Sequence, residues 1–286
     1  RSAMYCAVHG PMPGSADQRA TMSSSVRSAR KSTAPATSAC ATARIVAARA
    51  PVIRGVVGWT VQILGELLIT LGLVLLLFVG WQLWWTNIDA DRAQAQAVQR
   101  LNEQFSGPTT PQPDAQKDWG EPVVGKAPAH GQPFGIVYIP RFGEDYERPL
   151  VQGTSQDVLD TLGLGHYDSS AMPGAVGNVA VAGHRQTNGK VLDRIDELSP
   201  ADRIYVRTAD GYYTYAVRNR EIVLPSDASV IAPVPGEPGK EPADRLLTLT
   251  SCNPRFGSTE RFIVYAVLER WQPASAGPPE EIAHQL

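Results

Sequence analysis

Hydrophobic positions along this chain form one long continuous run and, further on, a series of short ones. The long run covers residues 55–85 and holds a single charged side chain, Glu66, while its core at 67–85 holds none. Nineteen helical residues reach about 28 Å, close to the thickness of a bilayer's hydrocarbon core. The pattern therefore predicts a transmembrane helix over residues 55–86, with a buried core helix of a soluble protein as the alternative.

Tryptophans and charges flank this run as they flank membrane spans. Trp81, Trp84 and Trp85 cluster at one end and Trp59 lies near the other, where amphipathic rings suit the membrane–water interface. Residues 1–54 carry eight Lys/Arg and one acid, whereas residues 86–286 carry 18 Lys/Arg and 26 Asp/Glu, a net charge of −8.

The charge asymmetry predicts the topology of the chain. By the positive-inside rule the basic arm at 1–54, expected to be disordered, stays in the cytoplasm and the acidic remainder lies outside. We predict an uncleaved signal anchor and a single-pass protein of the cell membrane. A cleaved signal peptide is the alternative, but the apolar run is too long and no clear cleavage site follows it.

The residues after the apolar run divide into a linker and a body. Residues 87–105 continue as a polar helical pattern, and residues 106–132 carry five prolines. We predict that residues 87–133 form a helical stalk and a Pro-rich tether that holds the body off the membrane.

The body shows short β-rich runs separated by Gly and Pro. They predict strands at 135–139, 148–152, 178–182, 202–208, 212–224, 245–251 and 260–271, and two short helices at 190–198 and 228–231. The fold class is therefore mainly β: one closed β-barrel of seven to eight strands with two or three short helices, over residues 134–272, preceded by one transmembrane helix. Residues 273–286 are expected to be a disordered tail.

The last two predicted strands carry the most informative side chains. Cys252 ends the strand at 245–251 and Arg261 begins the next one, so an antiparallel hairpin can place them side by side. Cys252 is the only cysteine on the outer side of the span, which leaves it no intrachain disulfide partner. A thiol beside a fixed cation suits acyl transfer at cysteine. The alternative is a buried structural cysteine.

Acyl transfer at cysteine also needs a proton donor for the leaving amine. His184 is the best candidate, because it follows a buried-looking strand and opens a polar loop. The other outer histidines are weaker, since they fall in the tether, in a surface turn and in the tail: His130, His166 and His284. Among the arginines, Arg261 is preferred to Arg255, which is expected to be a solvated loop residue.

Three segments together resemble the sortases, the membrane-anchored cysteine transpeptidases of Gram-positive bacteria. They are Val-Ala-Gly-His-Arg at 181–185, Thr-Leu-Thr-Ser-Cys at 248–252, and Arg261. The family pattern is Thr-Leu-x-Thr-Cys, with an Arg about nine residues later and a His roughly 60–70 residues earlier. Here 68 residues separate His184 from Cys252.

Further segments are similar to the class E branch of high-GC actinobacteria, and the resemblance covers roughly residues 56–86 and 134–271. These segments are 65–68, 165–167, 171–174, 177–178 and 253–254. Ser251 departs from the family, which usually has Thr before the cysteine. Because the hydroxyl is kept, we expect altered packing or a slightly altered substrate contact rather than lost activity.

The resemblance implies roles and partners. Cys252 would attack the threonine carbonyl of a sorting signal, His184 would protonate the leaving glycine amine, and Arg261 would steady the oxyanion. The signal would be Leu-Ala-x-Thr-Gly in secreted proteins, cut between Thr and Gly, and an amine of a peptidoglycan precursor would accept the acyl group. We expect substrate contacts from Thr250, Ser251, Asn253 and Tyr167. The expected partners are these two substrates and the lipid bilayer, without nucleic acid, metal or organic cofactor.

Three other functions remain open at this point. A membrane-anchored cysteine peptidase would pass the same acyl group to water. A catalytically silent β-barrel would bind or scaffold envelope proteins. A pilin-polymerising sortase would join its substrate to another protein.

Overall fold

The computed structural model describes residues 50–112 and 118–286, so the basic arm predicted over 1–54 lies almost wholly outside the described residues. The first element is helix α2 (Ala50–Gln104). Within it, Val57–Trp81 is long and apolar enough to cross a membrane, by length and composition. None of this apolar window is buried in the protein, unlike a core helix of a soluble protein.

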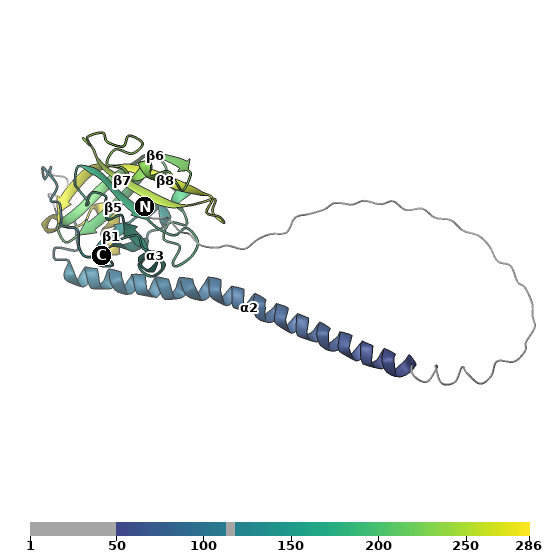
Figure 1. The fold of residues 1–286 in the computed structure, drawn as a ribbon. Helices are drawn as coiled ribbons and strands as arrows, with labels where there is room; N and C mark the ends of the chain where they lie inside the picture. The colour runs from purple at the N-terminus through teal and green to yellow at the C-terminus, as the bar shows by residue number, and fades with distance from the viewer. Residues whose placement is uncertain (1–49, 113–117) are drawn as a thin grey trace, which may run out of the picture. The chain divides into compact units, whose positions relative to one another are not determined.

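The chain divides into two compact units between Gly80 and Trp81. The unit that begins at Trp81 contains a closed barrel in the strand order β1-β2-β3-β4-β7-β8-β6-β5. Figure 1 shows its strands curling into this barrel. The strands are β1 (Pro133–Tyr138), β2 (Glu147–Gln152), β3 (Leu164–His166), β4 (Gly177–Ala182), β5 (Arg203–Thr208), β6 (Gly211–Val223), β7 (Arg245–Asn253) and β8 (Glu260–Pro273). The predicted mainly β closed barrel is confirmed.

The seven predicted strands are all present, with ends within two residues of those expected. The three-residue strand β3 and the short helix α3 (Gln156–Leu162) were not predicted. The helix predicted at 190–198 is wrong, because only η2 (Ile195–Glu197) forms there, as one 3₁₀ turn. Asn188 and Lys190 adopt positive φ of 53° and 50°, which a right-handed helix does not accept. At the second predicted helix, η3 (Ala228–Ile231) is also 3₁₀, like η1 (Pro140–Phe142).

The barrel interior fixes which side chains point outward. Leu247 and Leu249 of β7 lie in the main core, each 1% exposed, together with Val179 and Val181 of β4. Successive strand residues point to opposite faces, so Thr250 and its even-numbered neighbours on β7 point away from this core. Cys252 is one of them, which excludes a place in the main core for its thiol.

The end of helix α2 packs on the barrel. In this distal segment (residues 81–104) Val98 and Leu101 are buried against Ile136 and Tyr138 of β1 and Tyr205 of β5. These three barrel residues alternate with core residues, so they form a second, outer cluster that the helix covers. The predicted polar stalk is thus an integral part of the folded unit.

The Pro-rich segment also lies along the barrel. The Tyr213 hydroxyl donates a hydrogen bond to the Val123 carbonyl, and the Trp271 indole N–H donates one to the Gly120 carbonyl at 3.0 Å. Trp119 packs against the main core. The described part of this segment, which was predicted to be an extended tether, is held against the body by these contacts.

The chain end departs from its prediction too. Residues 273–286 were expected to be a disordered tail, but they form the turns η4 (Ala274–Ala276) and η5 (Glu280–Gln285). Ile282 is fully buried in the outer cluster with Val98 and Leu101. A short segment with one apolar anchor gives no sequence signal for this, since its packing surface is made by the distal segment of α2.

Candidate active site

The β7–β8 hairpin brings Cys252 and Arg261 directly opposite each other. They are register partners in the antiparallel ladder, one pair before the strand ends at Asn253 and Glu260. Paired residues share a face, so both side chains lie on the outer face of the sheet. Cys252 is half-buried and is the only cysteine in the described part of the chain, whereas Arg261 is 4% exposed.

Backbone carbonyls fix the orientation of Arg261. Its Nη1 donates to the carbonyls of Ser258 and Glu260 at 2.9 and 2.8 Å. At 4% exposed, Arg261 is not a surface charge, and the Glu269 carboxylate further along β8 binds Arg203 at 2.8 Å. A buried guanidinium fixed in this way keeps its positive charge on the same face as the thiol.

Strand β4 brings His184 to the same level. It pairs with β7 in parallel, with Ala182 opposite Thr250, and the Gly183 N–H donates to the Thr250 carbonyl at 3.1 Å. His184 lies two residues beyond Ala182, just past the end of β4, and Cys252 lies two residues beyond Thr250 on β7. Because neighbouring strands lie about 4.8 Å apart, the backbones of residues 184, 252 and 261 span roughly 10 Å at one end of the barrel.

Asp160 on helix α3 holds the imidazole of His184. The His184 Nε2 lies 2.7 Å from Asp160 Oδ1, and the Asn188 side-chain amide donates to the same oxygen at 2.8 Å. The His184 side chain is 13% exposed and the Asp160 side chain 35%. Sequence analysis missed Asp160, and no local pattern marks it, because the short helix that carries it was not predicted.

Arg185 is a second residue that sequence analysis missed. It is 4% exposed and donates to Asn253 Oδ1 at 2.9 Å and to the Cys252 carbonyl at 3.4 Å. Asp196 pairs with it at 2.9 Å, and its guanidinium lies 5.6 Å from the centroid of the Phe262 ring. Arg185 therefore ties the loop after β4 to the backbone of the nucleophile candidate. Its place next to His184 was the available signal.

The predicted substrate contacts fall into two groups. Thr250 and Ser251 are buried, at 1% and 3% exposed, and their hydroxyls donate to the carbonyls of Val181 and Gly183 at 3.2 and 2.8 Å. The Ser251 hydroxyl thus links β7, which carries Cys252, to Gly183, the residue before His184. Either Ser or Thr can make this hydrogen bond.

The other two predicted contacts are half-buried near the same face. The Tyr167 hydroxyl lies 3.4 Å from Thr250 Oγ1, two residues before Cys252 on β7. The Asn253 side-chain amide donates to Glu260 at 2.7 Å. Tyr167 thus lies beside Thr250, and Asn253 follows the cysteine in the chain, whereas the hydroxyls of Thr250 and Ser251 are engaged within the sheet.

The remaining candidates have other partners. His166 is not a surface turn residue as predicted, because it is 1% exposed in β3 and hydrogen-bonds to Gln152 and the Ala171 carbonyl. Burial lowers the pKa of its imidazole, and the bond to Ala171 and the charge of Asp168 oppose this only in part. The others bind at the surface: His130 to Ser155, His284 to the Glu144 carbonyl, and Arg255 to Asp193.

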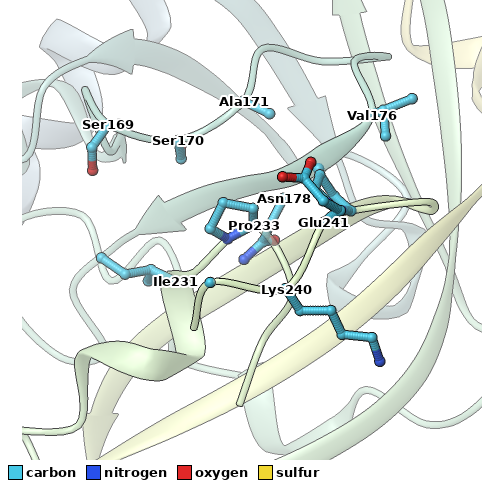
Figure 2. Close-up of a pocket in the computed structure, with 12 residues that line it drawn as sticks. Ser169, Ser170, Ala171, Val176, Asn178, Ile231, Pro233, Lys240 and Glu241 are labelled. Carbon is cyan, nitrogen blue, oxygen red and sulfur yellow. The ribbon is translucent and has the colours of Figure 1, made fainter. Parts of the chain in front are cut away.

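A hollow of about 380 Å³ lies near the start of β4. Figure 2 shows Pro233 and Glu241, from the segment between β6 and β7, across from Ser170 and Ala171. Asn178 belongs to its lining and accepts a hydrogen bond from the Thr248 hydroxyl at 2.7 Å. Thr248 precedes Cys252 by four residues, or roughly 13 Å of strand, so the hollow lies away from the thiol.

In the described residues, no group of three or more His, Cys, Asp or Glu side chains could hold a metal ion.

Comparisons with known proteins agree on one family. Residues 137–269 match the model of the sortase domain. The chain is 38% identical to sortase SrtE1 of Streptomyces coelicolor over 228 residues, 77% of this chain and 60% of that protein, so it spans less than two thirds of this relative. It is 31% identical to SrtE2 of the same organism, over 78% of this chain and 88% of the relative.

Solved structures give the same result. The SrtA sortase from Actinomyces oris matches with a TM-score of 0.55 and 38% identity, over 57% of this chain and 94% of that one. Sortase E from Streptomyces avermitilis matches with a TM-score of 0.50 and 39% identity, over 54% of this chain and 99% of that one. The range that matches the family model, 137–269, includes His184, Cys252 and Arg261.

Proposed function

Because this chain belongs to the sortase family, we propose that it is a cysteine transpeptidase acting at the outer face of the membrane. Sortases act on proteins that carry sorting signals and on cell-wall precursors. The observation that supports the proposal best is the pairing of Cys252 with the buried Arg261, on the strand next to the one that leads to His184.

The reaction begins with attack of the Cys252 sulfur on the threonine carbonyl of the sorting signal. The peptide bond to glycine breaks and a thioester forms, while His184 gives its proton to the leaving glycine amine. The entering amine then attacks the thioester and loses a proton to His184. A new amide forms at the threonine, and the sulfur leaves as the thiolate. No net oxidation or reduction takes place.

Arg261 stabilises the charge that develops in both steps. A guanidinium stays charged at every working pH and offers several N–H donors in a fixed plane. The carbonyls of Ser258 and Glu260 hold Nη1, so the group needs little reorganisation when the carbonyl oxygen becomes an oxyanion. Arg185 acts on the other side of the nucleophile by holding the Cys252 carbonyl and Asn253.

The substrates follow from the sortase E relatives and from the topology of the chain. We assign the signal Leu-Ala-x-Thr-Gly, cut between Thr and Gly, in secreted proteins, and an amine of a peptidoglycan precursor as acceptor. The basic arm lies in the cytoplasm and the barrel outside, because Lys and Arg concentrate before the span Val57–Trp81. Tyr167, which lies beside Thr250, and Asn253, which follows Cys252, are assigned contacts with the bound signal.

Incubation of the full chain in lipid nanodiscs with a Leu-Ala-x-Thr-Gly peptide and a short diamine tests this function. We expect a peptide cut after threonine and joined to the diamine, detected by mass spectrometry. A Leu-Pro-x-Thr-Gly peptide is the matched control and should react more slowly. Cleavage without any amine adduct would make the protein a peptidase, and no cleavage would favour a silent barrel.

Asp160 is a positioning residue in this scheme. A carboxylate at 2.7 Å fixes the ring orientation of His184. For Asp160→Asn we expect a loss in kcat/KM of roughly tenfold, carried by kcat, with KM within about twofold of the parent. Because the amide keeps the shape of the carboxylate, a loss carried by KM instead would place Asp160 in substrate binding rather than in the positioning of His184.

A further inference from the structure

The end of the barrel that carries Cys252 is hydrogen-bonded to the distal segment of α2. Asn87 Oδ1 accepts a hydrogen bond from the Gly189 N–H at 2.9 Å. Two helical turns further along the same face, the Gln94 side chain, which is 1% exposed, donates to the Asn188 carbonyl at 3.3 Å. Asn188 and Gly189 belong to the loop that starts at His184, and Asn188 also binds Asp160.

The candidate membrane span ends six residues before this contact. Its last residue is Trp81, and Asn87 follows after about 9 Å of helix. The rings of Trp81 and Trp85 are exposed and stacked with centroids 6.4 Å apart, as suits residues at the membrane–water interface. The headgroup layer is about 5–8 Å thick on each side, and any tilt of the helix lowers the height of Asn87 above it.

The same end of the barrel carries exposed apolar side chains. Phe256, in the loop that follows Cys252, is 90% exposed. Leu224 is 65% exposed and follows Val223, the β6 residue paired with Arg261, and Ile222 is 52% exposed. These three residues form an apolar rim around the Cys252 end. Exposed apolar side chains that gather at one end of a barrel mark an interaction surface, which a single one would not.

The charges at this end of the barrel are of both signs. Two of its carboxylates are paired with cations, Asp193 with Arg255 at 2.6 Å and Asp196 with Arg185 at 2.9 Å, whereas Glu260 is bound to the Asn253 side-chain amide. Lys190, next to Gly189, adds an exposed ammonium group. Basic side chains close to a bilayer are attracted by acidic lipids.

We propose that the Cys252 end of the barrel rests on the outer leaflet of the membrane, with Phe256 inserted among the lipid headgroups. We take the partner to be lipid rather than protein for the following reason. Asn87, which contacts the loop that starts at His184, lies only six helical residues beyond the end of the candidate span at Trp81. The consequence of this contact for catalysis rests on the proposed function. The thioester would form at the level of the lipid headgroups, where a lipid-linked amine is concentrated in two dimensions. The rim thus favours acceptors embedded in the membrane.

Spin labelling of the full chain tests the contact without any need for activity. A nitroxide is attached at Phe256→Cys in a Cys6→Ser, Cys40→Ser, Cys252→Ala background, in nanodiscs of phosphatidylglycerol and phosphatidylethanolamine. Lys240→Cys is the control, since Lys240 lines the hollow by the start of β4. We expect the ratio of collisions with oxygen to collisions with a nickel chelate to be at least about threefold higher at 256 than at 240.

Two outcomes of this measurement would overturn the proposal. Equal ratios at the two positions would mean that the catalytic end faces water. Protection of position 256 from both oxygen and nickel would mean that protein covers the loop, in which case the rim is a docking site for a protein.

A kinetic comparison gives a second test. For Phe256→Ser we expect transfer to a lipid-linked amine to fall by at least about fivefold, with transfer to a soluble diamine unchanged, and Phe256→Leu should behave as the parent. An equal fall with both amines would place Phe256 in substrate binding and contradict the membrane role. If the parent protein transfers to neither amine, the proposed function fails, while the collision ratios still decide the membrane contact.

Discussion

Replacing Cys252 with alanine is expected to abolish both cleavage of the signal peptide and transfer to the amine. The thioester needs the sulfur, and nothing else on this face of β7 can replace it, because the Thr250 hydroxyl is buried and donates to the Val181 carbonyl. We expect the rate to fall by at least about 10⁴-fold. Single-turnover assays that detect the acyl-enzyme by mass spectrometry measure this directly.

The change should leave the fold intact, since Cys252 is half-buried and lies outside the main core. Equal melting temperatures of parent and Cys252→Ala proteins are the control. The parent should also be inactivated rapidly by a thiosulfonate reagent. A Cys252→Ala protein with full biological function, together with an inert thiol in the parent, would favour the silent scaffold.

Replacement of Arg261 with lysine should lower kcat by about 10²–10³-fold with little change in KM. Lysine keeps the positive charge but loses the planar set of donors, two of whose contacts are made to the carbonyls of Ser258 and Glu260. The loss therefore falls on the transition state, where the oxyanion needs oriented donors. Steady-state kinetics with the soluble diamine separate kcat from KM.

Arg255→Ala provides a matched control for Arg261→Lys. Arg255 lies in the same hairpin loop but is exposed and binds Asp193. Its loss removes an exposed ion pair, which is worth little, so the rate with the soluble diamine should stay within about twofold of the parent. Near-parental turnover by Arg261→Lys and Arg261→Ala would remove Arg261 from the chemistry.

Sequence patterns predicted the structure best where several consecutive residues share one property, such as a high β-propensity or an apolar side chain. Short β-rich runs bounded by Gly and Pro defined β4, β7 and β8 to within two residues. The antiparallel hairpin predicted from the last two runs placed Cys252 and Arg261 side by side, and the register confirms this pairing. The apolar run before residue 81 was equally clear, since length and composition suffice to define a candidate span.

Patterns failed where a short segment is shaped by its surroundings. Helix α3 and strand β3 together hold ten residues, too few for a period to show, yet α3 supplies Asp160 to His184. His166 looked like a turn residue because glycine precedes it, but partners on β2 and in the following loop satisfy both ring nitrogens in the interior.

By itself the sequence determined the candidate span, the barrel class and the identity of the thiol, the cation and the imidazole, because each depends on local composition or on spacing along two or three strands. Only the tertiary structure decided that Asp160 and Arg185 support this site. It also decided that the Pro-rich segment, the chain end and the distal segment of α2 pack on the barrel. These contacts join residues far apart in the chain, and their strength comes from surfaces that exist only once the barrel has closed.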